Sequence, residues 1–144
     1  MKRRSLFVFV LALVLSFALT APTAIAKDMT GKDFVVEAKK AICEISVAEA
    51  KGLLDAGGYV FLDCRTAKEY KMGHIPGAIN IQRGVMEFKI GKKIQDKAAN
   101  IVMYCKTGGR GSLATCTICK MGYKNVKNMA GGWMAWEKAG YPIE

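Results

Sequence analysis

The 144-residue sequence contains one histidine, His74, and only three prolines. A zinc site that uses several histidines is therefore excluded, and a Cys–His catalytic pair would have to use His74. So few prolines exclude a proline-rich or collagen-like rod. The lysines are scattered without a block of five or six, which favours a solvated surface over a nucleic-acid partner. We expect one globular domain with no metal ion and no cofactor.

The first 26 residues have the pattern of a secretory signal peptide. Residues 2–4 are Lys-Arg-Arg, residues 6–15 are an unbroken apolar run, and residues 24–26, Ala-Ile-Ala, fit a cleavage site. An uncleaved membrane anchor is the alternative, but the apolar stretch is short for a span of about 20 residues. We therefore expect an exported, periplasmic protein with no stable membrane anchor after cleavage. Cleavage would remove three positive charges from the net charge of +10.

The remaining chain alternates short apolar runs with amphipathic runs, which predicts an α/β domain at residues 42–144. Its sheet should be mainly parallel, with about five strands and helices on both faces. Residues 27–41 are polar and are expected to form a loose N-terminal extension, and residues 82–99 show no clear element. Predicted strands occupy 42–45, 59–62, 78–81, 101–104 and 125–128, and predicted helices follow Ser46 and Thr66 and occupy 112–121 and 133–139.

The segment 104–112 carries the strongest functional signal. Cys105 directly follows a predicted buried strand and precedes a predicted helix, where α/β sheets bind ligands. Glycines can turn successive N–H groups toward one point, and a helix N-terminus adds positive potential. Such surroundings lower the pKa of a thiol, so we predict an ionised, reachable nucleophile. The glycines and cations that follow within six residues are Lys106, Gly108, Gly109, Arg110 and Gly111.

The loop chemistry alone leaves the reaction open. Phosphate ester cleavage, arsenate reduction and sulfur transfer would all use an anion cradle beside a thiolate. An inert, buried cysteine in a glycine-rich connection is the remaining alternative. The order of the other motifs distinguishes between these possibilities.

Two further sets of motifs flank this loop. Residues 63–65 (Asp-Cys-Arg), 69–70 (Glu-Tyr) and 73–80 (Gly-His-Ile-Pro-Gly-Ala-Ile-Asn) come before it. Residues 122–123 (Gly-Tyr), Val126, 131–133 (Gly-Gly-Trp) and Trp136 come after it. In this order and spacing, the chain resembles a single-domain rhodanese, a sulfurtransferase, over about residues 42–143.

The resemblance implies a reaction and a set of site residues. A cysteine thiolate of this family attacks the outer sulfur of a small anionic donor such as thiosulfate or polysulfide and becomes a persulfide. A thiol or cyanide then accepts the sulfur. The related phosphatases and arsenate reductases have a loop one residue longer. The resemblance implies that Cys105 is the catalytic residue and that the substrate-binding residues are Lys106, Thr107, Gly108, Gly109 and Arg110.

Two other functions remain as alternatives. The chain could be a non-enzymatic carrier that holds a persulfide and delivers the sulfur to a partner protein. It could also be a small phosphatase or arsenate reductase, against which the short loop argues. The sequence gives no indication of the oligomeric state.

The other cysteines have weaker signals. The fold that the resemblance implies places Cys64 near Cys105, so Cys64 is either a resolving thiol or, as we favour, a small core residue. Cys116 and Cys119 have redox-motif spacing but fall inside a predicted helix, which favours two ordinary helix residues. Cys43 has no predicted role. With five cysteines, an oxidising compartment leaves at least one thiol unpaired.

Charged and aromatic residues near the motifs are expected to be structural. Asp63, Arg65 and Glu69 should form a cluster that fixes a helix against a strand end. His74 lies in a Gly-His-Ile-Pro-Gly turn and is expected to be structural as well. The tryptophans at 133 and 136 are predicted to lie in the core.

Overall fold

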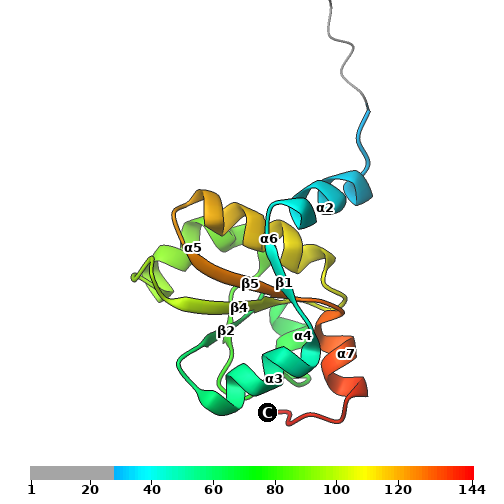
Figure 1. Cartoon of the computed structure of the whole chain (residues 1–144), viewed down its shortest axis with the longest axis vertical. Helices are drawn as coiled ribbons and strands as arrows, with labels where there is room; N and C mark the ends of the chain where they lie inside the picture. The colour runs from blue at the N-terminus through cyan, green and yellow to red at the C-terminus, as the bar shows by residue number, and fades with distance from the viewer. Residues whose placement is uncertain (1–27) are drawn as a thin grey trace, which may run out of the picture.

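The computed structural model describes residues 28–144, so the predicted signal peptide lies outside the described residues. These residues form an α/β domain around a five-stranded sheet in which every pair of neighbouring strands is parallel (Figure 1). The strand order is β1-β5-β4-β2-β3. The predicted fold class is therefore confirmed. The strands are β1 (Cys43–Ile45), β2 (Val60–Asp63), β3 (Ile79–Asn80), β4 (Asn100–Tyr104) and β5 (Asn125–Met129).

Helices cover both faces of the sheet (Figure 1). One apolar cluster packs under α5 and α6, and a second packs under α3 and α7. The central strand β4 contributes to both, because Ile101 and Met103 point to the first and Val102 and Tyr104 to the second. The helices are α2 (Gly31–Lys40), α3 (Val47–Ala56), α4 (Ala67–Lys71), α5 (Met86–Lys93), α6 (Gly109–Lys120) and α7 (Gly132–Lys138), with a 3-10 turn η1 at Arg83–Val85.

The helix starts that the sequence indicated are capped as expected. At α3, the Glu49 N–H donates to the Ser46 hydroxyl at 3.2 Å, and the Ser46 N–H donates to the Glu49 carboxylate at 2.7 Å. The same reciprocal pair joins Thr66 and Glu69 at α4. Each cap satisfies two backbone N–H groups that have no partner inside the helix. Among residues 28–144, none of the helices has the length and apolar character needed to cross a bilayer.

The expectation of a loose extension at residues 27–41 is wrong. Residues 31–40 form α2, which begins with a capping box between Thr30 and Asp33 and runs beside α6 (Figure 1). Ala38 is buried, and Val35 lies next to the first residue of α6. The segment is helical because a cap and a narrow apolar face coincide, although most of its residues are polar.

Two other elements differ from their predicted bounds. Residues 82–99, which have no clear pattern, contain η1 and α5, and Met86 and Ile90 of α5 are fully buried one helical turn apart. The helix predicted at 112–121 begins three residues earlier, at Gly109. Gly108 precedes it with a left-handed φ of 99°, and its carbonyl accepts the Ser112 N–H at 2.8 Å.

Candidate functional site

Cys105 lies at the carboxyl end of β4, under the first turn of α6. The Gly108 N–H donates to the Cys105 Sγ at 3.1 Å. The backbone amides of Thr107 and Gly111 also lower the pKa of this thiol. The first turn of α6, the positive end of a 12-residue helix, therefore lies at the thiol.

Hydrogen bonds set the ionisation of Cys105. A hydrogen bond from the neighbouring Cys64 thiol lowers the pKa of Cys105 most strongly, and the amides of Gly111, Thr107 and Gly108 lower it further. Burial opposes them, and the resulting pKa is about 5. The same hydrogen bond, together with burial, raises the pKa of Cys64 far above its ordinary value. Near neutral pH the pair therefore consists of a Cys105 thiolate and a protonated Cys64.

Cys105 is not freely reachable, contrary to our expectation. The residue is 1% exposed, and it belongs to the apolar cluster under α5 and α6. Its sulfur nevertheless faces polar N–H groups and not only hydrocarbon. The next residue, Lys106, lines a pocket.

The first turn of α7 is hydrogen-bonded to the loop that begins at Cys105. The Trp133 N–H donates to the Cys105 carbonyl at 2.7 Å, and the Met134 N–H donates to the Lys106 carbonyl at 3.0 Å. Gly132 permits this approach, because a Cβ at this position would collide with the Cys105 carbonyl oxygen. Thus the first turns of both α6 and α7 direct N–H groups at the Cys105 loop.

The side chain of Arg110 is paired with a carboxylate of the protein. Its guanidinium binds Glu69 of α4 through two hydrogen bonds, at 2.8 and 3.1 Å. This guanidinium is the main reason that the pKa of Glu69 is lowered to about 2. The predicted charge cluster is thus divided, because Glu69 pairs with the loop whereas Asp63 and Arg65 form a separate buried ion pair at 2.6 Å. Lys106 is exposed and remains the loop cation that faces the pocket.

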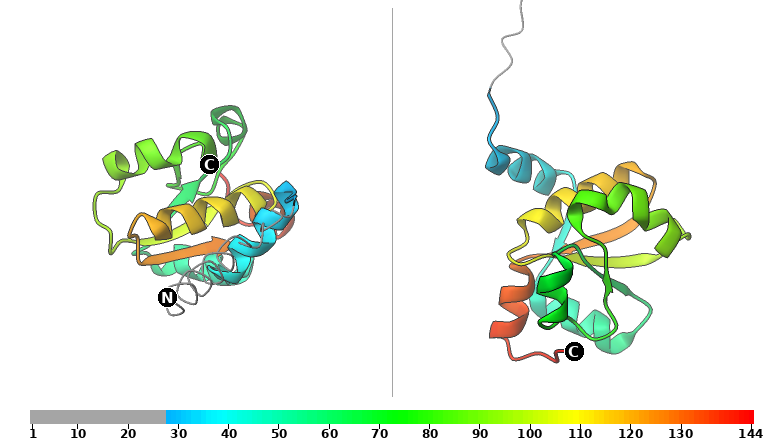
Figure 2. Two further views of the ribbon diagram at one scale, coloured as in Figure 1. Left: turned by 90° about the horizontal axis from the view of Figure 1, so that it is seen from above. Right: turned by 180° about the vertical axis from the view of Figure 1, so that it is seen from behind.

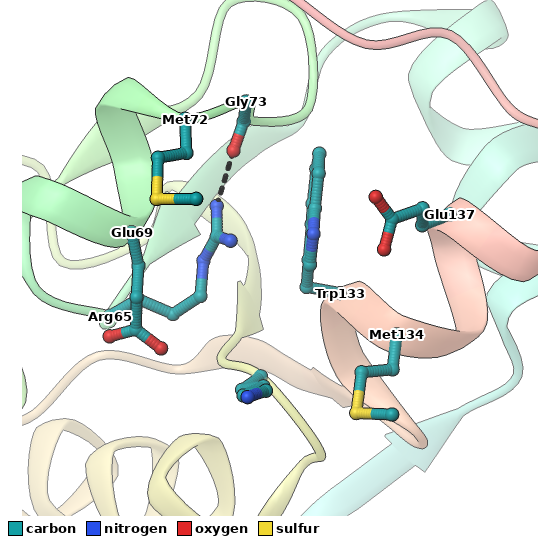
Figure 3. Close-up of a pocket in the computed structure, with 8 residues that line it drawn as sticks. Arg65, Glu69, Met72, Gly73, Trp133, Met134 and Glu137 are labelled. Carbon is teal, nitrogen blue, oxygen red and sulfur yellow. Dashed lines mark hydrogen bonds between the residues drawn. The ribbon is translucent and has the colours of Figure 1, made fainter.

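The pocket beside the loop has a volume of about 330 Å³ (Figure 3). Its centre is a stack in which the Arg65 guanidinium lies 4.4 Å from the centroid of the Trp133 ring. The same guanidinium donates to the Gly73 carbonyl at 2.8 Å. Met72 and Met134 are exposed at its rim. One wall of the pocket is therefore cationic and aromatic. Two of the residues that line it, Arg65 and Lys106, directly follow Cys64 and Cys105 in the sequence.

Sequence reasoning missed one residue behind the loop, Asn128 of β5. Its side-chain amide is buried and donates to the Ser112 hydroxyl at 3.1 Å and to Glu44 at 2.7 Å. Its Oδ1 occupies the place where a Cβ of Gly111 would lie. A side chain at position 111 would therefore displace the Asn128 amide from its hydrogen bonds. No local signal in the sequence links positions 111 and 128.

The structure also places the remaining residues that the sequence singled out. His74 stacks on Tyr70 at 3.7 Å between ring centroids and pairs its backbone with Glu144 at 2.9 Å, a structural role. Trp136 is fully buried and Trp133 is 9% exposed, as expected for core residues. All five cysteines are free thiols: Cys43 is exposed, Cys116 and Cys119 are half-buried on α6, and Cys64 and Cys105 are buried.

The rhodanese-like domain family matches residues 46–139 of the chain. The chain belongs to this family. It is 33% identical over 120 residues to thiosulfate sulfurtransferase 16 of Arabidopsis thaliana, and the match covers 76% of this chain and 99% of that protein. Proteins of this rhodanese-like group include sulfurtransferases, so sulfur transfer is the general chemistry of the relatives.

Solved structures of similar proteins have the same fold. A Rhodopseudomonas palustris protein of unknown function, described as a possible tyrosine phosphatase, superposes with a TM-score of 0.75 and 33% identity. That match covers 87% of this chain and all of that chain. The thiosulfate sulfurtransferase of Pseudomonas aeruginosa superposes with a TM-score of 0.70 at 25% identity, over 79% of this chain and 22% of that chain.

Proposed function

We propose that the protein is an exported, periplasmic sulfurtransferase in which Cys105 carries a sulfane sulfur from an anionic donor to a thiophilic acceptor. The donor is thiosulfate or polysulfide, and the acceptor is cyanide or a thiol. The observation that carries the proposal is the Cys105 sulfur, held at 3.1 Å from the Gly108 N–H at the start of α6.

The first half-reaction uses the thiolate as nucleophile. The Cys105 Sγ attacks the outer sulfur of thiosulfate, the sulfur–sulfur bond of the donor breaks, and sulfite leaves with the electron pair. The product is a persulfide whose outer sulfur carries the negative charge. We expect the amides that face the Cys105 sulfur, that of Gly108 among them, to stabilise that charge, since preformed N–H groups need no reorganisation during the reaction.

The second half-reaction regenerates the thiolate. Cyanide or an external thiolate attacks the outer sulfur of the persulfide, the bond between the two sulfurs breaks, and the electron pair returns to Cys105. A low pKa of Cys105 favours this step, because a stabilised thiolate is a good leaving group.

Incubation of the reduced protein with thiosulfate, followed by intact-mass analysis, tests the proposal. We expect a gain of one sulfur atom on Cys105 and continuous formation of thiocyanate once cyanide is added. A protein that gains the sulfur but does not turn over is a carrier. Hydrolysis of a phosphate ester without any sulfur uptake would contradict the proposal and favour a phosphatase.

A Lys106→Gln variant is expected to raise the KM for thiosulfate about fivefold while changing kcat by less than about twofold. Lys106 is the exposed cation at the pocket, whereas Arg110 is already paired with Glu69. Removing its charge should weaken attraction of the dianion without touching the reacting sulfur. The variant should also lose most of the salt dependence of kcat/KM, since salt screens charge attraction.

A Lys89→Gln variant is the matched control, because Lys89 is exposed on α5 and does not line the pocket. It should keep the native KM and the native salt dependence. Equal effects of the two substitutions would mean that net charge, and not the position of Lys106, attracts the donor.

A further inference from the structure

Cys64 and Cys105 occupy equivalent places on neighbouring strands. Asp63 of β2 and Tyr104 of β4 are register partners, and the Cys64 N–H donates to the Tyr104 carbonyl at 2.9 Å. Both thiols belong to the same apolar cluster, so they point to the same face of the sheet. Neighbouring strands lie about 4.8 Å apart, within the range of about 4.4–6.8 Å between Cα atoms that a disulfide needs.

The two thiols also differ in ionisation. The Cys64 thiol donates its hydrogen to the Cys105 sulfur, so it stays protonated beside a thiolate. Both residues are 1% exposed, so the adjacent Cys64 has better access to the Cys105 sulfur than a large external thiol has. The amides that face Cys105 come from the loop and from α6, whereas Cys64 approaches from the end of β2. Cys64 and the amides therefore approach the Cys105 sulfur from different elements.

We propose that Cys64 is the resolving thiol of this site, a role that rests on the proposed sulfur transfer to Cys105. When no external acceptor takes the outer sulfur, the Cys64 thiol passes its proton to that negatively charged sulfur, and the resulting Cys64 thiolate attacks the inner sulfur of the persulfide. A Cys64–Cys105 disulfide forms, the bond to the outer sulfur breaks, and that sulfur leaves as hydrosulfide with the proton of Cys64. The persulfide and the disulfide have the same oxidation level, so this step needs no oxidant.

The resolved enzyme must then be reduced. An external dithiol transfers two electrons and two protons to the disulfide, becomes a cyclic disulfide itself, and restores the Cys64 thiol and Cys105. The protein thereby has a second product route, in which thiosulfate and a dithiol yield sulfite and hydrosulfide. External nucleophiles that attack the outer sulfur compete with Cys64, so cyanide should suppress release of hydrosulfide.

The test follows a single turnover of reduced, full-length protein with thiosulfate and no acceptor. The native protein should release one hydrosulfide per chain and lose two hydrogen atoms, and peptide mass spectrometry should locate the disulfide at 64 and 105. A Cys64→Ser variant should instead keep the extra sulfur on Cys105 at least about tenfold longer. A Cys119→Ser variant, which removes a half-buried thiol on α6, should behave as the native protein does. Cys64→Ala replaces Cys64→Ser if the serine variant does not fold.

The outcomes separate the two proposals. A persulfide that persists equally in the native protein and in Cys64→Ser, without hydrosulfide, overturns the resolving role and leaves the proposed sulfur transfer standing. If no variant gains sulfur, both proposals are overturned. Treatment with a diazenedicarboxamide oxidant tests the geometry independently of sulfur chemistry, and a folded native protein that forms no disulfide between 64 and 105 also overturns the resolving role.

Discussion

A Cys105→Ser variant is expected to take up no sulfur from thiosulfate and to form thiocyanate more than about a thousandfold more slowly than the native protein. A serine hydroxyl is not ionised near neutral pH, and the amides around it cannot lower its pKa enough to make it a nucleophile. The variant should fold, because a hydroxyl is close in size to a thiol and can still accept the Gly108 N–H. Intact-mass analysis and steady-state thiocyanate formation measure the two losses.

The Cys119→Ser variant is the control for the loss of a thiol as such. It should load and turn over at native rates, since Cys119 lies on α6 and away from the amides that face Cys105. Circular dichroism should show that both variants are folded. Thiocyanate formation by Cys105→Ser within about tenfold of the native rate would mean that another residue carries the sulfur.

A Gly132→Ala variant is expected to lose about 3 kcal/mol of the free energy of unfolding and to load sulfur much more slowly. Gly132 has a φ of 57°, which strains any residue with a Cβ. That Cβ would also collide with the Cys105 carbonyl and lie 3.0 Å from the Gly108 nitrogen. The loop that carries the thiol would have to move away from α7, and its hydrogen bond to Trp133 would weaken. Urea denaturation measures the loss of stability.

Gly140→Ala separates the strain of a positive φ from the collision with the Cys105 loop. Gly140, just after the end of α7, has a similar positive φ of 69°, but a Cβ there would meet nothing within 4 Å. This variant should lose only about 1 kcal/mol and should load sulfur at the native rate. If the two alanine variants were equally stable and equally active, contact with the Cys105 loop would not be what requires glycine at position 132.

Much of the fold and the centre of the site could be predicted because their signals are local. The apolar run that ends at Tyr104 and the glycines that follow it indicate a strand, a turn and a helix start in consecutive order. That order alone places Cys105 at the carboxyl end of a strand and under a helix N-terminus. The capping boxes at Ser46 and Thr66 are equally local, and both are present in the structure.

The parts that sequence reasoning missed depend on contacts between distant segments. Arg110 looks like a free cation in the sequence, and only the packing of α4 against the loop shows that Glu69 neutralises it. The requirement for glycine at position 111 arises from Asn128, which lies on another strand. The burial of Cys105 has the same origin, because Cys105 belongs to an apolar cluster to which α5 and α6 both contribute.

Helix α4 and helix α7 lie side by side on the face opposite α6 (Figure 2). The pocket residues Glu69, Met72 and Gly73 come from the α4 side, and Trp133, Met134 and Glu137 come from α7. Arg65 lies between the two groups (Figure 3). The pocket is therefore built from two short helices that no single sequence motif joins.

A measurement of the pKa of Cys105 tests most directly whether this residue is a thiolate at neutral pH. Thiolate absorbance in the ultraviolet, recorded from about pH 3 to about pH 10 as the difference between the native protein and Cys105→Ser, measures it without any reagent that must reach the buried sulfur. We expect the difference to rise with a midpoint near pH 5. Cys64→Ala should move that midpoint upward, because it removes the strongest hydrogen bond to the sulfur. A midpoint in the ordinary range of a thiol, about 8.5, would contradict the account, since the sulfur would then be protonated at neutral pH and unable to attack a donor.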